Sequence, residues 1–251
     1  MEYKLTKCPV CGSIEIQLIA REASGDDIYC VYKCLSCDSI CKGEPHKEIN
    51  IKRQNNVTSA KDIYEQNKNS VVEIYASFND TTQAGTGVII NDRIILTNAH
   101  VLLSADQEPS DIISINLPKS NERIPAEIEC YDLDNDLALL ITKCKIGKPV
   151  SLSSKKVCTG DNCYIIGNQK GQGINMVDGM ISDSSRVVCG QEYIMFSGLV
   201  TTGNSGGPLF DENGKLIGIV TSGYKGAVGM NYAIPLSNET LIDYINDYFK
   251  R

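Results

Sequence analysis

The chain has 251 residues, of which 42% are hydrophobic and 22% charged, a composition that suits one large folded domain plus a small module. Its formal net charge of −7 argues against a surface devoted to phosphate backbones, and no run approaches the roughly 18 apolar residues of a membrane-spanning helix. The N-terminus lacks the apolar core of a signal peptide, so we expect a cytoplasmic protein.

Eleven cysteines are unevenly spread, and six of them fall within residues 8–41. Without a signal peptide, metal ligation and free thiols fit better than a disulfide framework. Two C-x2-C pairs flank two alternating apolar runs whose centre is the turn signal of residues 24–27, which predicts a β-hairpin. Two such knuckles joined by a hairpin are typical of a structural zinc ribbon, with the four thiolates in a tetrahedral site: Cys8, Cys11, Cys34 and Cys37.

The alternatives for this segment are two chance C-x2-C motifs or a redox dithiol, and the paired knuckles with Gly12 after the first favour zinc. A module of about 40 residues buries too little apolar surface to fold alone, so the metal must supply much of its folding free energy. Cys30 alternates with inward-facing strand positions and is interpreted as a packing residue. Cys41 is not assigned as a ligand, although a substitute role is open.

We predict a zinc ribbon over residues 1–42, a polar linker over 43–58 and a larger domain over 59–251. His46 lies among charged residues of the linker and receives no role. Ser59 is placed to cap a short helix that ends at Asn67. Residues 237–251 carry the apolar spacing of an amphipathic helix that packs against the domain, with Leu241, Ile242, Ile245 and Phe249 on one face.

Many short strands separated by turn signals, with no long helices between them, predict an all-β sandwich or a pair of barrels. The expected strands are 71–75, 85–90, 94–97, 112–117, 126–131, 137–142, 163–166, 173–182, 193–197, 208–210, 216–221 and 230–234.

Ser205 is the candidate nucleophile, because it lies in a glycine-rich stretch, residues 202–208, that keeps a side chain accessible. In such a loop the amides of Gly203 and Ser205 can converge on one carbonyl oxygen and stabilise an oxyanion. A plain glycine-rich turn is the alternative.

His100 is the candidate base, because the other histidine lies in the linker. Asp136 is the candidate orienting acid: it directly precedes the apolar strand 137–142, where we expect a buried carboxylate, whereas Asp132 and Asp134 are expected to be turn residues. Alone, His100 could be a structural histidine at a strand exit, and all three aspartates could be turn residues.

Three stretches together, residues 97–101 (TNAHV), 135–139 (NDLAL) and 203–207 (GNSGG), resemble the trypsin-like serine peptidases and most closely the HtrA (Deg) type. Residues 167–168, 179–182, 214–219 and 232–235 add to the similarity, which covers residues 60–236. The resemblance implies a mainly β, chymotrypsin-like double β-barrel that cleaves protein or peptide substrates with His100, Asp136 and Ser205. It implies no cofactor for catalysis and a quality-control or regulatory role.

The sequence departs from family patterns at informative positions. Val101 replaces a disulfide cysteine of secreted relatives, and Asn204 replaces the aspartate that pairs with a new N-terminus in zymogens, so activation by N-terminal cleavage is not expected. HtrA relatives usually add a C-terminal PDZ domain, which we do not expect here. They commonly form trimers, which leaves homo-oligomerisation open.

By resemblance, Leu199, Val200, Thr201, Thr221, Ser222 and Gly223 line the primary substrate pocket, with Met230 close by. No acidic residue lies at its base, so we expect a small or medium apolar residue before the scissile bond. Residues 221–223 are expected to pair with the substrate backbone as an added strand.

Two other functions are weighed against the enzyme. The first is a non-catalytic module that uses a protease scaffold while the ribbon recognises protein. The second is a nucleic-acid-binding ribbon, which the near balance of acidic and basic residues in 1–47 does not favour.

Overall fold

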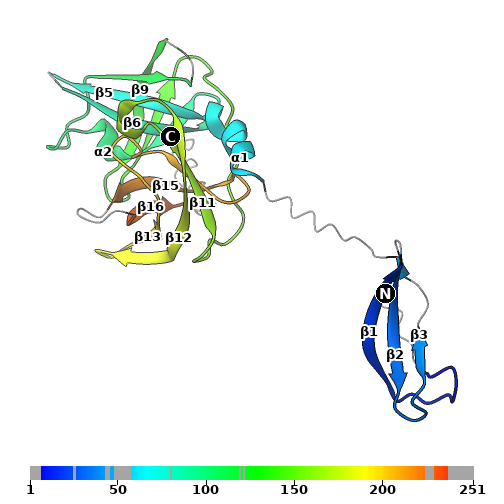
Figure 1. Ribbon diagram of the computed structural model, residues 1–251. Coiled ribbons are helices and arrows are strands. Elements are labelled where there is room, and N and C mark those ends of the chain that lie inside the picture. The colour runs from blue at the N-terminus through cyan, green and yellow to red at the C-terminus, as the bar shows by residue number, and fades with distance from the viewer. Residues whose placement is uncertain are drawn as a thin grey trace, which may run out of the picture. The chain divides into compact units, whose positions relative to one another are not determined.

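The structure is a computed structural model that describes residues 7–24, 27–42, 46–47, 58–79, 81–118, 120, 122–223 and 229–236. It divides into two units, residues 1–56 and 57–251, and each is treated by itself (Figure 1). The helix predicted over 237–251 lies outside the described residues. Among those described, no helix is long and apolar enough to cross a membrane.

The first unit contains a small antiparallel sheet of β1 (Ile16–Ser24), β2 (Asp27–Cys34), β3 (Ile40–Lys42) and β4 (His46–Lys47). The predicted hairpin is correct, because β1 and β2 pair from Ile16 with Cys34 to Ser24 with Asp27, with one shift of register between Leu18 and Ala20. The sheet does not stop at residue 42, however. β4 pairs with the start of β2, Ile28 opposite His46, so the ordered sheet extends into the predicted linker by using a free strand edge.

The second unit begins with α1 (Ala60–Asn67) and a short 3₁₀ turn, η1 (Lys68–Ser70). Ser59 caps α1 as predicted, since its side chain accepts a hydrogen bond from the N–H of Asp62.

Twelve strands among the described residues then form two closed six-stranded barrels. The first barrel runs in the order β10-β7-β6-β5-β8-β9, with β5 Val71–Phe78, β6 Thr81–Asn91, β7 Ile94–Thr97, β8 Ile112–Asn116, β9 Arg123–Asp132 and β10 Leu137–Thr142. The second runs β11-β12-β13-β16-β15-β14, with β11 Asn162–Gly167, β12 Asn175–Val188, β13 Gln191–Phe196, β14 Pro208–Phe210, β15 Leu216–Gly223 and β16 Asn231–Pro235.

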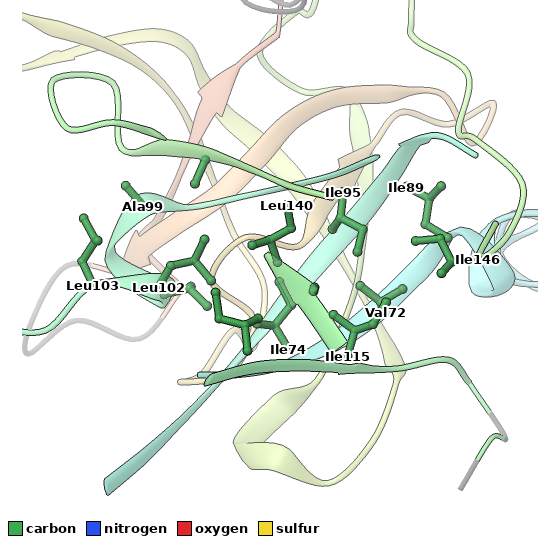
Figure 2. Packing of buried hydrophobic residues seen from close by; sticks show 14 residues of the cluster. Val72, Ile74, Ile89, Ile95, Ala99, Leu102, Leu103, Ile115, Leu140 and Ile146 are labelled. Atoms are coloured by element: carbon green, nitrogen blue, oxygen red, sulfur yellow. The ribbon is translucent and has the colours of Figure 1, made fainter. Parts of the chain in front are cut away.

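Each barrel is filled by its own aliphatic core. In the first barrel Ile74, Ile95, Ile115 and Leu140 point inward and are fully buried (Figure 2). A second cluster joins the barrels, because it combines residues of the first barrel, such as Leu96, with residues of the second. Burial of a large aliphatic side chain contributes roughly 1.5–3 kcal/mol, so this shared cluster fixes one barrel against the other.

Three connections carry the predicted catalytic residues. His100 lies on α2 (Ala99–Leu102), one short helical turn directly after β7. Asp136 ends the loop between β9 and β10, and Ser205 lies between β13 and β14. Residues more than 100 positions apart in the chain are therefore brought to the junction of the two barrels.

Candidate active site

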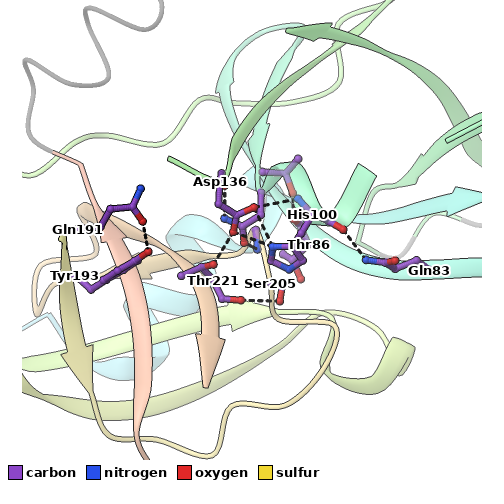
Figure 3. A network of polar contacts seen from close by, with 11 residues as sticks. Gln83, Thr86, His100, Asp136, Gln191, Tyr193, Ser205 and Thr221 are labelled. Atoms are coloured by element: carbon purple, nitrogen blue, oxygen red, sulfur yellow. Dashed lines mark hydrogen bonds and ion pairs between the residues drawn. The ribbon is translucent and has the colours of Figure 1, made fainter. Parts of the chain in front are cut away.

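The structure places His100 against Asp136 (Figure 3). Nδ1 of His100 lies 2.8 Å from Oδ2 and 3.0 Å from Oδ1 of Asp136, and the backbone N–H of His100 donates to Oδ1 at 3.0 Å. A carboxylate in this position fixes Nδ1 as the protonated ring nitrogen and leaves Nε2 as the acceptor. The side chains are 44% (His100) and 27% (Asp136) exposed, so the carboxylate is half-buried and not buried as predicted.

The loop that carries Asp136 is anchored through its backbone. Asp136 has a φ of +51°, and its carbonyl accepts hydrogen bonds from the Asn98 side chain at 2.9 Å and from the N–H of Ala99 at 3.3 Å. Asp132, by contrast, caps the turn by accepting from the N–H of Asn135 at 3.0 Å. Of these two carboxylates, only that of Asp136 faces the imidazole, as the sequence predicts.

Ser205 lies in the same network, but its hydroxyl donates to the carbonyl of Thr221 at 3.0 Å. Within the described residues no hydrogen bond joins Ser205 Oγ to His100. The hydroxyl of Thr221 donates to Asp136 Oδ2 at 2.6 Å, so Thr221 contacts the serine through its backbone and the carboxylate through its side chain (Figure 3). Thr221 is one of the predicted pocket residues, and its side chain also bonds the predicted orienting acid.

The peptide group before Gly203 is held in a defined orientation, because the carbonyl of Thr202 accepts from the N–H of Lys170 at 2.7 Å. In a trans peptide the carbonyl and the following N–H point in opposite directions, so the N–H of Gly203 faces away from Lys170. Gly203 has a φ of +95°, and a Cβ there would collide with the carbonyl of Asn168, so only glycine fits. Neither the N–H of Gly203 nor that of Ser205 donates to another described residue.

The other predicted pocket residues are described in part. Leu199 is 69% exposed, and its carbonyl accepts from the Gln169 side chain at 2.6 Å. Val200 is half-buried and Thr201 exposed. Ser222 and Gly223 end β15, where their backbones pair with Tyr232 and Asn231 of β16. The segment after Gly223, residues 224–228, lies outside the described part, so the outer wall of the pocket stays a prediction.

The four predicted zinc ligands cluster in the first unit. Their sulfur atoms all lie within 4.8 Å of one another, with Cys8 3.7 Å from Cys37 and Cys11 3.6 Å from Cys34. Four sulfurs at about 2.3 Å from a tetrahedral Zn²⁺ stand about 3.8 Å apart, so the cluster has the size of such a site.

The two knuckles are built alike. The N–H groups of Gly12 and Asp38, both at positive φ, donate to the carbonyls of the first cysteine of their own pairs. The N–H groups of Cys11 and Val10 point at the Cys8 sulfur and lower the pKa of that thiol, which favours the thiolate at this one of the four positions. Cys41, which the sequence does not assign as a ligand, is buried in the same small cluster as Cys8 and Cys34.

Comparison with known proteins identifies the family of the second unit. The family model described as "Trypsin-like peptidase domain" matches residues 85–219, more than half of the chain. The chain belongs to this family. It is 30% identical over 224 residues to serine endoprotease DegS of Haemophilus influenzae, an alignment that covers 80% of this chain and 63% of that protein. It is 32% identical over 174 residues to a probable periplasmic serine endoprotease DegP-like of Pseudomonas putida, which covers 66% of this chain and 35% of that one.

Solved structures of this family show the same fold. The HtrA-type protease AlgW with tripeptide superposes with a TM-score of 0.67 at 28% identity, over 74% of this chain and 62% of that one. The serine endoprotease from Yersinia pestis gives 0.67 at 25% identity, over 77% and 67%. The predicted HtrA resemblance and the double β-barrel are therefore confirmed, and the chain spans less than two thirds of the two curated relatives named above.

Proposed function

We propose that the chain is a serine endopeptidase in which Ser205 is the nucleophile, His100 the general base and acid, and Asp136 the residue that orients His100. The observation that carries this proposal is the contact of 2.8 Å between His100 Nδ1 and Asp136. It lies beside Ser205, where the N–H groups of Gly203 and of Ser205 itself have no partner among the described residues. The names of the relatives, serine endoproteases, support the same reaction.

In this mechanism Ser205 Oγ forms a bond to the carbonyl carbon of the scissile peptide while its proton passes to His100 Nε2. His100 then gives the proton to the leaving nitrogen as the C–N bond breaks, which leaves an acyl ester on Ser205. Water repeats the sequence and frees the acid. Asp136 stays ionised throughout and stabilises the imidazolium, and no cofactor takes part.

The N–H groups of Gly203 and Ser205 form the oxyanion hole in this proposal. Both lack a partner among the described residues, and the bond between Lys170 and Thr202 turns the first of them away from the loop of residues 168–171. Donors fixed in advance stabilise the charge that develops on the substrate oxygen without further reorganisation.

Substrates are proposed to be proteins or peptides with a small or medium apolar residue before the scissile bond. Residues 199–201 and 221–223 would line that pocket, and the carbonyl of Thr221 would pair with the substrate backbone. Since this carbonyl accepts the Ser205 hydroxyl in the structure, substrate binding would release that hydroxyl toward His100. Cleavage of a peptide library tests the preference, and a dominant basic residue would contradict it.

Reaction with a fluorophosphonate tests the catalytic proposal. The wild-type protein should gain one adduct on Ser205 by intact mass, and Ser205→Ala should gain none while its circular dichroism is unchanged. A folded wild-type protein that is inert both to the probe and to a peptide library would favour the alternative, a protease-like scaffold used only for binding.

We also propose that Cys8, Cys11, Cys34 and Cys37 hold one structural Zn²⁺. The distances of 3.6 and 3.7 Å between their sulfurs support this assignment. Metal analysis should give one zinc per chain, and Cys37→Ser should lose most of it. Cys144→Ser is the matched control, since Cys144 is an exposed free thiol outside the cluster. Zinc retention in the Cys37→Ser variant would contradict the site.

A further inference from the structure

We propose that the hydroxyl of Thr86, on β6 of the first barrel, positions the loop of residues 202–205, which carries the proposed oxyanion donors of the second barrel. This inference rests on the proposed acyl transfer to Ser205. Thr86 is fully buried and lies beside the catalytic residues (Figure 3). Its hydrogen bonds single it out.

The hydroxyl joins two segments of the second barrel. It donates to the carbonyl of Gly203 at 2.6 Å and accepts from the N–H of Asn168 at 2.9 Å. A hydroxyl has a single proton, so the acceptor role toward Asn168 leaves that proton committed to Gly203. The direction of the bond is therefore set.

The backbone of Thr86 completes the attachment. Its N–H donates to the carbonyl of Ser205 at 2.9 Å, and its own carbonyl accepts from the hydroxyl of Thr97 at 2.7 Å. One residue of the first barrel thus holds the carbonyls of both Gly203 and Ser205, the residues whose N–H groups are left free.

These bonds act on both sides of Gly203. The carbonyl after Gly203 is held directly by the hydroxyl. The peptide before it is held by Lys170, and Lys170 lies two residues after Asn168, which the same hydroxyl anchors. Removing the hydroxyl therefore loosens the peptide on each side of the proposed oxyanion donor.

The backbone of neighbouring glycines lies close against the Thr86 side chain, and a Cβ at Gly167 would stand 3.1 Å from its hydroxyl oxygen. A Cβ at Gly207 would stand 3.2 Å from Cγ2 of Thr86, and one at Gly206 or Gly203 would collide with backbone carbonyls. A water molecule needs the volume of about one probe sphere and two to four polar partners, so we expect none to replace the hydroxyl.

The test compares three variants by the second-order rate of fluorophosphonate labelling and by kcat and KM on a peptide from the library. Thr86→Val has nearly the same shape and lacks the hydroxyl, whereas Thr86→Ser keeps it. Loss of a direct oxyanion donor costs about 10²–10³ in kcat, so for this indirect effect we expect roughly a 10- to 100-fold loss of kcat and of labelling rate in Thr86→Val, with KM within about threefold. Thr86→Ser should stay within about threefold of wild type.

Thr142→Val is the matched control. Thr142 is also a buried strand threonine of the first barrel, and its hydroxyl donates to the carbonyl of Cys144 at 2.8 Å, away from the proposed catalytic residues. It should lose thermal stability like Thr86→Val and keep its activity, which separates positioning from stability.

The proposal is overturned if folded Thr86→Val is labelled as fast as wild type, if Thr86→Ser is as slow as Thr86→Val, or if Thr142→Val loses as much activity. If Thr86→Val does not fold, Thr86→Cys replaces it, because a thiol is a weak donor of similar size to serine. It should react about tenfold more slowly than Thr86→Ser, and equal rates would overturn the proposal. Absence of labelling in the wild type would instead overturn the proposed function itself.

Discussion

The hydroxyl of Thr221 offers a sharp test of the acid's role, through the substitution Thr221→Val. The 2.6 Å bond from this hydroxyl to Asp136 Oδ2 is a hydrogen bond to a charged group, a class worth about 1.5–3 kcal/mol. Because the Asp136 side chain is 27% exposed, water can replace part of the lost bond, and the lower end, about 1.5 kcal/mol, is the better expectation. This corresponds to about a tenfold loss of kcat/KM, at about 1.4 kcal/mol per factor of ten.

The loss should appear mainly in kcat, because the imidazolium that Asp136 stabilises forms in the transition state. Steady-state kinetics on one peptide substrate measure it, and Thr221→Ser, which keeps the hydroxyl, should remain near wild type. A Thr221→Val enzyme within twofold of wild type would refute the reasoning. Equal losses in the two variants would also refute it, because Thr221→Ser keeps the hydroxyl and lacks only the methyl group.

Three further predictions concern the surrounding structure. Asn98→Leu removes the hydrogen bonds that the Asn98 side chain makes with the carbonyl of Asp136 and with the N–H of Gly206. The free energy of unfolding measured by urea titration should therefore fall by about 1–3 kcal/mol. An unchanged midpoint of the urea unfolding curve would contradict this prediction. Burial raises the pKa of the Cys163 thiol to about 12, so this thiol stays protonated at pH 8. Iodoacetamide should therefore modify Cys163 far more slowly than the exposed Cys158, as measured by peptide mass mapping. Similar rates at the two cysteines would argue against the buried environment of Cys163. Leu140→Ala empties a fully buried site in the first barrel and should cost about 2–5 kcal/mol in the same titrations, and a cost below 1 kcal/mol would mean that the core collapses onto the gap.

The fold could be predicted from the sequence wherever an apolar run coincides with a strand. The bounds of β7, β10 and β14 agree with the prediction, because each is a short apolar run between turn residues. β12 continues to Val188, six residues past its predicted end at 182. The extension, residues 183–188, is partly or fully exposed and is held by hairpin pairing with β13, in which Val188 lies opposite Gln191. Its sequence shows no apolar alternation that would predict a strand.

The site could be predicted where a residue type is scarce or lies in a distinctive motif. His100, Asp136 and Ser205 meet these conditions, and the structure gathers them. Thr86 and Thr221 do not, since a threonine within an apolar strand is a common β-former whose partners lie elsewhere in the chain. Only the closed barrels bring Gly203 and Asp136 within reach of these two hydroxyls.

The junction between the barrels has a practical consequence for measuring how much of this protein is in its native state. Hydrogen bonds of Thr86 and Asn98 join the two barrels and also hold the loops that carry the proposed catalytic residues. A small separation of the barrels therefore disturbs catalysis while each barrel keeps its own sheet. On gentle warming, turnover should fade at a lower temperature than circular dichroism does, and it should return on cooling. Activity is then a more sensitive measure of the contact between the barrels than circular dichroism is.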